Sequence, residues 1–270
     1  MLRYASRMPI LRLFIPLLAL ISAPAAAQWP NGAKAAVALT YDDALASQLD
    51  IAAPALNRAG LKGTFFLSNI KREHVDRWRA LARKGHELAN HTLFHPCPAA
   101  AFPADPRYTS EAYQPEQMIR EIAQQEVLLT AIDGRPSHGF ASPCTVNEVN
   151  GKDYLEPLRA AGIVDYARSE GDAAAGRRET ISDPMRIAGR AFDEATTGEQ
   201  LIAYAQATAS EGSVAVYVFH GVGGDYLTTS AAAHEALLAW LAANRRDVWV
   251  APLGEIVAWS KRHPNPSHRR

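Results

Sequence analysis

The stretch AAVALTYDDALASQ (35–48) joins an apolar run to a helical pattern through two adjacent aspartates. The uncharged run at 35–41 is typical of a buried strand, and the segment at 44–59 has the pattern of a helix. The same strand-then-helix order recurs along the rest of the chain. This repetition predicts an α/β fold with a mostly parallel sheet, either open or closed as a barrel.

The other expected elements follow the same pattern. Strands are expected at 63–68, 87–89, 138–141, 163–167, 185–188, 213–219 and 247–251. Helices are expected at 75–83, 115–131, 198–209 and 231–244. On the helix at 115–131, we expect Glu121, Gln125 and Glu126 to face solvent. The proline-rich stretch at 96–115 predicts a long surface loop, of the kind that often borders sites in α/β folds.

The aspartate pair Asp42-Asp43 stands where the first strand is expected to end. Ligands of α/β folds bind beyond the carboxyl ends of the strands, so the pair is well placed for a site. One carboxylate could bind a metal ion, which would relieve the repulsion, while the other stays free as a base. The alternative is a structural role, in which Asp43 caps the following helix and Asp42 is solvated.

A second candidate site lies in GHELANHTLFHP (85–96), where His91 and His95 are four residues apart. On a helical turn both imidazoles would lie on one face and could bind one ion. Spacing alone leaves a surface pair open as an alternative. Catalytic zinc sites commonly use two histidines, one carboxylate and an open position for water. Thr92 occupies the place of the glutamate in an H-E-x-x-H motif, which excludes the metalloprotease interpretation.

The third candidate is His220 in VYVFHGVGGDY (216–226), at the end of the most apolar strand and before a glycine-rich turn. A single histidine in this position can be structural or catalytic. The catalytic interpretation gains weight because parallel strands would bring His220 to the same rim as the other two segments.

The first 27 residues have the composition of a secretory signal peptide. Three arginines and no acidic residue accompany a short apolar core (14–21), which AAA (25–27) follows as a cleavage site. An uncleaved anchor is the alternative, although the core is short for a membrane span. Cleavage after Ala27 would leave 243 residues without a stable membrane span, enough for one domain at 28–260 and a tail at 261–270 expected to be disordered.

Cleavage would also leave 25 basic against 28 acidic side chains, a formal charge of −3. This charge argues against a nucleic-acid partner, because phosphate binding needs a clustered basic surface. Export to the periplasm or the medium would put Cys97 and Cys144 where a disulfide can persist. The oligomeric state is left open.

The three segments together resemble the polysaccharide deacetylase family, also called the NodB homology domain or carbohydrate esterase family 4. TYDD (40–43) resembles its first motif, HTLFH (91–95) its second and VFH (218–220) its last, in the same order across about 35–258. The resemblance implies a distorted (β/α) barrel with fewer than eight strands.

The resemblance also implies the roles of the site residues. A divalent metal ion, usually Zn²⁺, would be held by Asp43, His91 and His95. Asp42 would be the general base for the metal-bound water, and His220 would be the general acid for the leaving group.

The third motif of the family, RPPY, is changed in this chain to FASPCT (140–145). Ala141 stands where an arginine would steady the base aspartate, and Cys144 stands where the aromatic residue would be. The backbone N–H of Cys144 remains a candidate donor to the oxyanion. Arg168, near another expected strand end, is a candidate replacement for the arginine, with a surface ion pair as the alternative. Asp165 is the candidate for the aspartate that supports the catalytic histidine.

The convergence of these motifs would bring Cys97, two residues after a metal ligand, close to Cys144. The sequence therefore predicts a Cys97–Cys144 disulfide in an exported protein.

The function that this resemblance implies is metal-dependent hydrolysis of acetyl groups from a carbohydrate polymer or oligomer. An O-acetyl esterase of the xylan type is one alternative. A non-catalytic carbohydrate-binding relic is another, motivated by the missing arginine, although binding alone would not need Asp42 or His220. Candidate stacking surfaces for the sugar are provided by Trp29, Tyr41, Phe94 and Tyr226.

Overall fold

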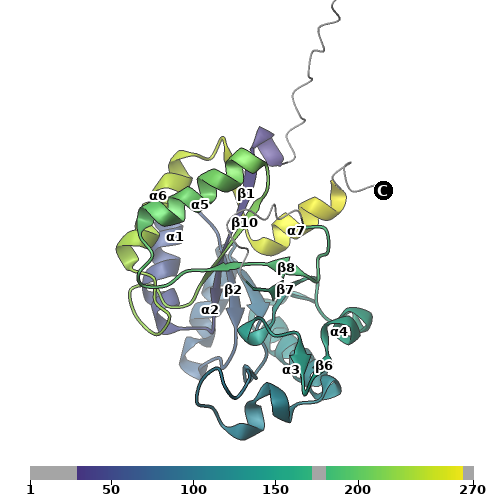
Figure 1. Cartoon of the computed structure of the whole chain (residues 1–270). Helices are drawn as coiled ribbons and strands as arrows, with labels where there is room; N and C mark the ends of the chain where they lie inside the picture. The colour runs from purple at the N-terminus through teal and green to yellow at the C-terminus, as the bar shows by residue number, and fades with distance from the viewer. Residues whose placement is uncertain (1–28, 172–180, 264–270) are drawn as a thin grey trace, which may run out of the picture.

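A parallel sheet forms the centre of the molecule, with helices around it (Figure 1). The computed structural model describes residues 29–171 and 181–263, so the expected signal peptide and most of the tail lie outside the described residues. The strand order is β8-β7-β4-β3-β2-β1-β10-β9, and β11 also pairs with β1. The strands are β1 (Ala35–Asp42), β2 (Thr64–Leu67), β3 (Glu87–Asn90), β4 (Phe140–Ala141), β7 (Ala167–Glu170), β8 (Ile187–Ala188), β9 (Arg190–Ala191), β10 (Val214–Phe219) and β11 (Val248–Val250).

Six helices follow strands of the sheet and lead to the next ones. They are α1 (Ala53–Ala59), α2 (Val75–Arg83), α3 (Pro115–Asp133), α4 (Leu155–Ala161), α5 (Gly198–Glu211) and α6 (Ala231–Ala243), with a small hairpin of β5 (Glu148–Val149) and β6 (Lys152–Asp153) before α4. The last helix, α7 (Leu253–Arg262), follows β11 and packs against the other face of the sheet. Helix α7 continues two residues past the expected domain end at 260. Within the described ranges, no helix combines the length and apolar character needed to cross a bilayer.

The barrel closes through one short stretch, 187–191. Its first part, β8, pairs with β7, and its second part, β9, pairs with β10, so the stretch joins the two edges of the sheet. Gly189, between them, has no room for a side chain, because a Cβ there would lie 2.6 Å from Val218 Cγ2 and 3.0 Å from Arg168 Cδ. The sheet is therefore a nearly closed, distorted barrel.

This barrel confirms the expected fold class but not the expected strand number. Eight strands of the described residues lie along the main path of the sheet, rather than fewer than eight. β8 and β9 have two residues each, which is too short for alternation of apolar and polar residues to reveal.

The two faces of β1 explain how the chain fills the barrel. Val37, Leu39 and Tyr41 belong to the hydrophobic cluster that the outer helices cover. Ala36 and Ala38 belong to a second cluster inside the barrel, which includes α7 residues such as Leu253. Successive side chains of a strand point to opposite faces, and both faces of β1 are covered. All residues of β1 are therefore buried, and Asp42, the last of them, is the first that carries a charge.

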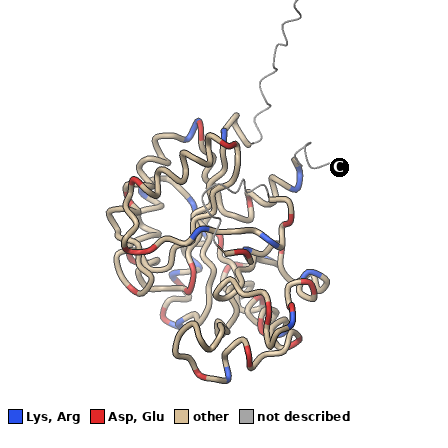
Figure 2. The backbone as a smooth tube through the Cα atoms, viewed as in Figure 1, with Lys and Arg blue, Asp and Glu red and all other residues tan. Residues whose placement is uncertain are grey.

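Charged residues of both signs are distributed along the described backbone. Lys and Arg are interspersed with Asp and Glu (Figure 2).

Candidate metal centre

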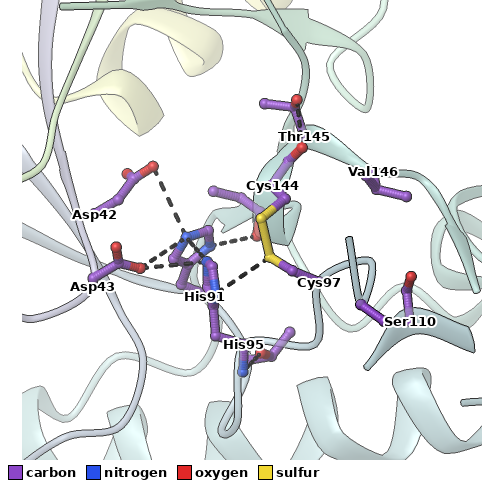
Figure 3. Close-up of a disulfide and its surroundings, with 12 residues drawn as sticks. Asp42, Asp43, His91, His95, Cys97, Ser110, Cys144, Thr145 and Val146 are labelled. Carbon is purple, nitrogen blue, oxygen red and sulfur yellow. Dashed lines mark hydrogen bonds and ion pairs between the residues drawn. A yellow bond between two sulfur atoms is a disulfide. The ribbon is translucent and has the colours of Figure 1, made fainter. Parts of the chain in front are cut away.

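Three strands end at the point where the sequence motifs meet. Asp42 ends β1, His91 directly follows β3, and His220 directly follows β10. Because β1, β2, β3 and β10 pair in parallel, their carboxyl ends lie at one rim of the barrel. Figure 3 shows the aspartates facing the histidines, with a disulfide on the far side of them.

The donor atoms of Asp43, His91 and His95 converge. Asp43 Oδ1 lies 3.4 Å from Nε2 of each histidine, and the two Nε2 atoms are 3.1 Å apart. Asp43 Oδ1 is buried without a hydrogen-bond partner among the described residues. An uncompensated buried carboxylate oxygen is costly, and a cation among these three donors would remove the cost. The set of two imidazoles and one carboxylate fits a divalent metal with an open position.

Both histidines are in the form that a metal requires. Burial lowers the pKa of His91 and of His95 to about 4, so both rings are neutral at pH 7. His91 Nδ1 lies 2.8 Å from the carbonyl oxygen of Ala141. A carbonyl only accepts, so Nδ1 carries the proton and Nε2 keeps its lone pair for a metal.

The turn that carries the histidines differs from the expected helical turn. Thr92 and His95 have positive φ values of 62° and 54°. The Asn90 side chain accepts a hydrogen bond from the Thr92 N–H, and the Thr92 hydroxyl accepts one from the His95 N–H. Side chains of the turn itself thus hold the left-handed residues, and the two imidazoles converge without a helix.

Helix α3 supports this turn with buried polar groups, contrary to the expectation that they face solvent. Glu121 Oε1 accepts hydrogen bonds from the N–H groups of Leu93 and Phe94, at 3.0 and 2.8 Å. Gln125 Nε2 donates to the carbonyl of Leu67 at the end of β2. The turn at 91–95 is therefore anchored to the inner face of α3.

A buried chain of polar groups continues from this turn to His138. Glu126 accepts a hydrogen bond from Asn90 Nδ2 at 2.8 Å and faces His138 Nδ1 at 2.9 Å. His138 Nε2 lies 3.1 Å from Asp133 Oδ1. Although burial alone would lower it, these two carboxylates raise the pKa of His138 to about 9.

This raised pKa predicts an alkaline loss of stability. In the unfolded chain the pKa of a histidine is ~6.5. The contribution of the His138 ion pairs to the free energy of unfolding is therefore complete below that pH and disappears as the pH rises through about 9. The free energy of unfolding should fall by ~3 kcal/mol across this window, at ~1.4 kcal/mol per pH unit. Urea titrations at several pH values measure it. His138→Gln should flatten the dependence, and an equally steep dependence in that variant would contradict this assignment.

Asp42 is paired with an arginine inside the barrel. Arg168 Nη2 donates to Asp42 Oδ2 at 2.5 Å, and both residues are buried. The guanidinium lies over the ring of Phe66, with Cζ 4.9 Å from the ring centroid. Burial alone would raise the pKa of Asp42, but the Arg168 charge, with smaller contributions from His91 and His220, lowers it below the ordinary value. Asp42 is therefore held ionised, and Arg168 is not a surface ion pair.

Gln48 is a residue of the site that the sequence reasoning missed. Its Nε2 donates to the backbone carbonyl of Asp42 at 2.5 Å and to that of His220 at 3.0 Å. Gln48 begins a short π-helical segment (Gln48–Ala52), a feature frequent at functional sites. It therefore links the ends of β1 and β10 just behind the site.

His220 and Asp165 lie at different ends of the barrel. His220 Nε2 is 3.8 Å from Asp43 Oδ2, so His220 borders the metal centre. Asp165 is exposed, precedes β7 and accepts a hydrogen bond from Ser137. The expectation that Asp165 supports His220 is wrong, because a residue before a parallel strand lies at the opposite rim.

The structure contains the predicted disulfide between Cys97 and Cys144, whose Cα atoms are 5.7 Å apart. Cys97 Sγ lies 3.5 Å from His95 Nδ1. Cys144 and Thr145 have positive φ values of 51° and 54°, so the disulfide holds a strained turn against the histidine loop.

Removing this disulfide should lower stability markedly. The disulfide joins residues 47 positions apart in sequence. Loop-closure entropy predicts that breaking a disulfide over such a loop lowers the free energy of unfolding by ~4 kcal/mol. We expect the Cys97→Ser/Cys144→Ser double variant to show this loss in urea denaturation, and reductant to destabilise only the wild-type protein. An unchanged wild-type midpoint after both thiols have been liberated and titrated would contradict the expectation.

A cavity of about 450 Å³ opens beside the donor cluster, and its lining includes Asp43, His95, Phe94, Phe102, Tyr108 and Tyr226. Phe94 and Tyr226 are exposed, as a stacking surface requires. Trp29 and Tyr41 are buried and are not available to a sugar, and the Tyr41 hydroxyl contacts His234 instead.

The comparisons with known proteins agree with this arrangement. Residues 30–162 match the family model described as polysaccharide deacetylase. A curated relative, gellan lyase from a Bacillus species, is 26% identical over 117 residues, which are 43% of this chain but only 4% of that protein. The chain therefore spans a small fraction of that relative's length.

Several solved structures have the same fold, and three of them illustrate the similarity. A Mycobacterium smegmatis protein assigned to the polysaccharide deacetylases has a TM-score of 0.62 and 20% identity, over 89% of this chain and 95% of that one. The peptidoglycan deacetylase PdaC from Bacillus subtilis has a TM-score of 0.54 and 14% identity, over 84% of this chain and 92% of that one. The Xyl-CE4 domain of a multidomain xylanase from the hindgut metagenome of Trinervitermes trinervoides has a TM-score of 0.54 and 18% identity, over 86% of this chain and 92% of that one.

The matched family model covers the first two motifs, and the barrel rim brings them together with the last one. The chain belongs to the polysaccharide deacetylase family.

Proposed function

We propose that this protein hydrolyses acetyl groups from a carbohydrate polymer or oligomer with the help of one divalent metal ion. The observation that carries the proposal is the pairing of buried Asp42 with Arg168 beside an uncompensated cluster of Asp43, His91 and His95. An ionised base next to three converging metal donors suits hydrolysis, whereas a binding module needs neither.

Asp43, His91 and His95 would hold the metal, and zinc suits their nitrogen and oxygen donors. When bound, such an ion polarises the acetyl carbonyl and makes a nearby water more acidic.

Asp42 acts as the general base that takes a proton from the attacking water. Its Oδ1 is buried without a hydrogen-bond partner among the described residues, while Oδ2 is occupied by Arg168. One oxygen is thus steadied and the other is free to accept a proton. Arg168 keeps the carboxylate ionised and aimed, and so does the work of the arginine missing at Ala141.

The other two steps fall to Cys144 and His220. The Cys144 N–H, in the turn fixed by the disulfide, donates a hydrogen bond to the oxyanion of the tetrahedral intermediate. His220 gives a proton to the departing nitrogen or oxygen of the sugar, which breaks the bond to the acetyl carbon.

The presence of Arg168 weakens the case for a non-catalytic relic, because that alternative was motivated by a missing arginine. N-acetyl and O-acetyl substrates are separated by a release assay on chitin, peptidoglycan and xylan fragments. Acetate from N-acetylated oligomers supports amide hydrolysis, and acetate from xylan alone supports the esterase. If no fragment yields acetate, only the relic survives. The disulfide also supports our proposal that the protein works after export, in the periplasm or the medium.

A further inference from the structure

The two carboxylate oxygens of Asp43 have different partners. Oδ1 faces the histidines, as described above, whereas Oδ2 accepts a hydrogen bond from the Tyr226 hydroxyl at 2.9 Å. Asp43 is not a helix cap in this structure: the partner of its side chain is a tyrosine 183 residues away in sequence.

The loop that carries Tyr226 is held firmly to the barrel. The Gly221 N–H donates to the carbonyl of Tyr226, and the Ser47 N–H donates to Asp225 Oδ2 at 2.8 Å. A Cβ at Gly221 would lie 2.0 Å from the carbonyl oxygen of Gly224, so only glycine fits there. The glycine-rich turn after β10 thus fixes the tyrosine backbone.

The ring of Tyr226 does little packing. The residue is 54% exposed and lines the cavity beside the metal centre. A half-exposed ring on a rigid loop, with its hydroxyl on a buried carboxylate, indicates a role for the hydroxyl rather than for core packing.

We propose that Tyr226 is a positioning residue for the metal centre, which holds Asp43 so that one oxygen faces His91 and His95. The inference rests on the proposed metal-dependent function. The hydrogen bond holds Oδ2, which restrains rotation of the carboxylate. His220 Nε2 lies 3.8 Å from the same oxygen, so the shorter contact of Oδ2 is the one with Tyr226. Partners that orient metal ligands in this way typically contribute ~10–100-fold to metal affinity.

The test compares zinc affinity in Tyr226→Phe and in Leu227→Ala, by competition with a chromophoric chelator. Leu227, the next residue, is 60% exposed and serves as the matched control. We expect Tyr226→Phe to raise the Kd for zinc by ~10–100-fold, with an unchanged melting temperature of the metal-free protein. Leu227→Ala should leave the Kd unchanged.

The outcomes separate the two claims. A wild-type protein that binds zinc, with the same Kd in Tyr226→Phe, overturns the inference and leaves the proposed function standing. A wild-type protein that binds no zinc overturns both. Weaker binding in both variants would assign the effect to the loop as a whole and would also overturn the role of the hydroxyl.

Discussion

Asp42→Asn should lose acetate release by ~10²–10⁴-fold while the protein keeps its metal, because general-base catalysis typically contributes that much. Asparagine preserves the shape of the side chain and an oxygen that can accept from Arg168, but it cannot take a proton from water. Asp43→Asn should instead lower the metal content, because it removes an anionic ligand from a set of three. His220→Ala should resemble Asp42→Asn, with metal retained and the leaving group unprotonated.

Bound metal and acetate release on these variants decide whether the adjacent aspartates have separate roles. A purely structural pair would give losses of ~1 kcal/mol in stability and little change in rate per folded molecule. Near wild-type activity in Asp42→Asn would refute the division of labour. Loss of metal in Asp42→Asn would refute it as well, since it would make both aspartates ligands.

Arg168→Met should have the second largest effect, on both rate and stability. Removing one partner of a buried ion pair typically costs ~3–5 kcal/mol, because the other charge stays buried and unpaired. A nearby cation lowers the pKa of a carboxylate. Without Arg168, Asp42 should stay protonated to a higher pH, so that the acid limb of the kcat profile moves to higher pH.

The double variant Asp42→Asn/Arg168→Met separates pairing from packing. Stability should recover in part, because neither charge remains buried alone. Metal content should be unchanged in Arg168→Met, since Arg168 touches none of the three donors. An unaltered pH–rate profile in the folded single variant would show that Arg168 does not tune the base.

The sequence was sufficient for the parts of the site that lie at strand ends. A charge directly after an uncharged run marked Asp42 and Asp43, and the same logic applied to His220. Arg168 was a candidate for the same reason, but its partner depended on the strand order. Only the pairing of β4 with β7 places Arg168 opposite Ala141, where an arginine was expected. Strand β7 therefore supplies the arginine that β4 lacks.

The supporting residues left no comparable signal. A polar residue on a helix is expected at the solvent face by default, so Glu121 and Glu126 were misplaced. In the structure Glu121 accepts a hydrogen bond from the backbone of the turn at 91–95, and Glu126 accepts one from Asn90. Gln48 and Tyr226 act through contacts with segments more than 170 residues away in sequence. Such contacts depend on the closed barrel, which a local pattern cannot encode.

The most direct test of metal-dependent deacetylation is a single titration on the wild-type protein. Chelated protein is reloaded with increasing zinc while acetate release from an acetylated oligosaccharide is followed. We predict that release is absent after chelation and rises with bound zinc until one ion is held per chain. A protein that binds zinc at this site but releases no acetate from either N-acetylated or O-acetylated sugars would contradict the account.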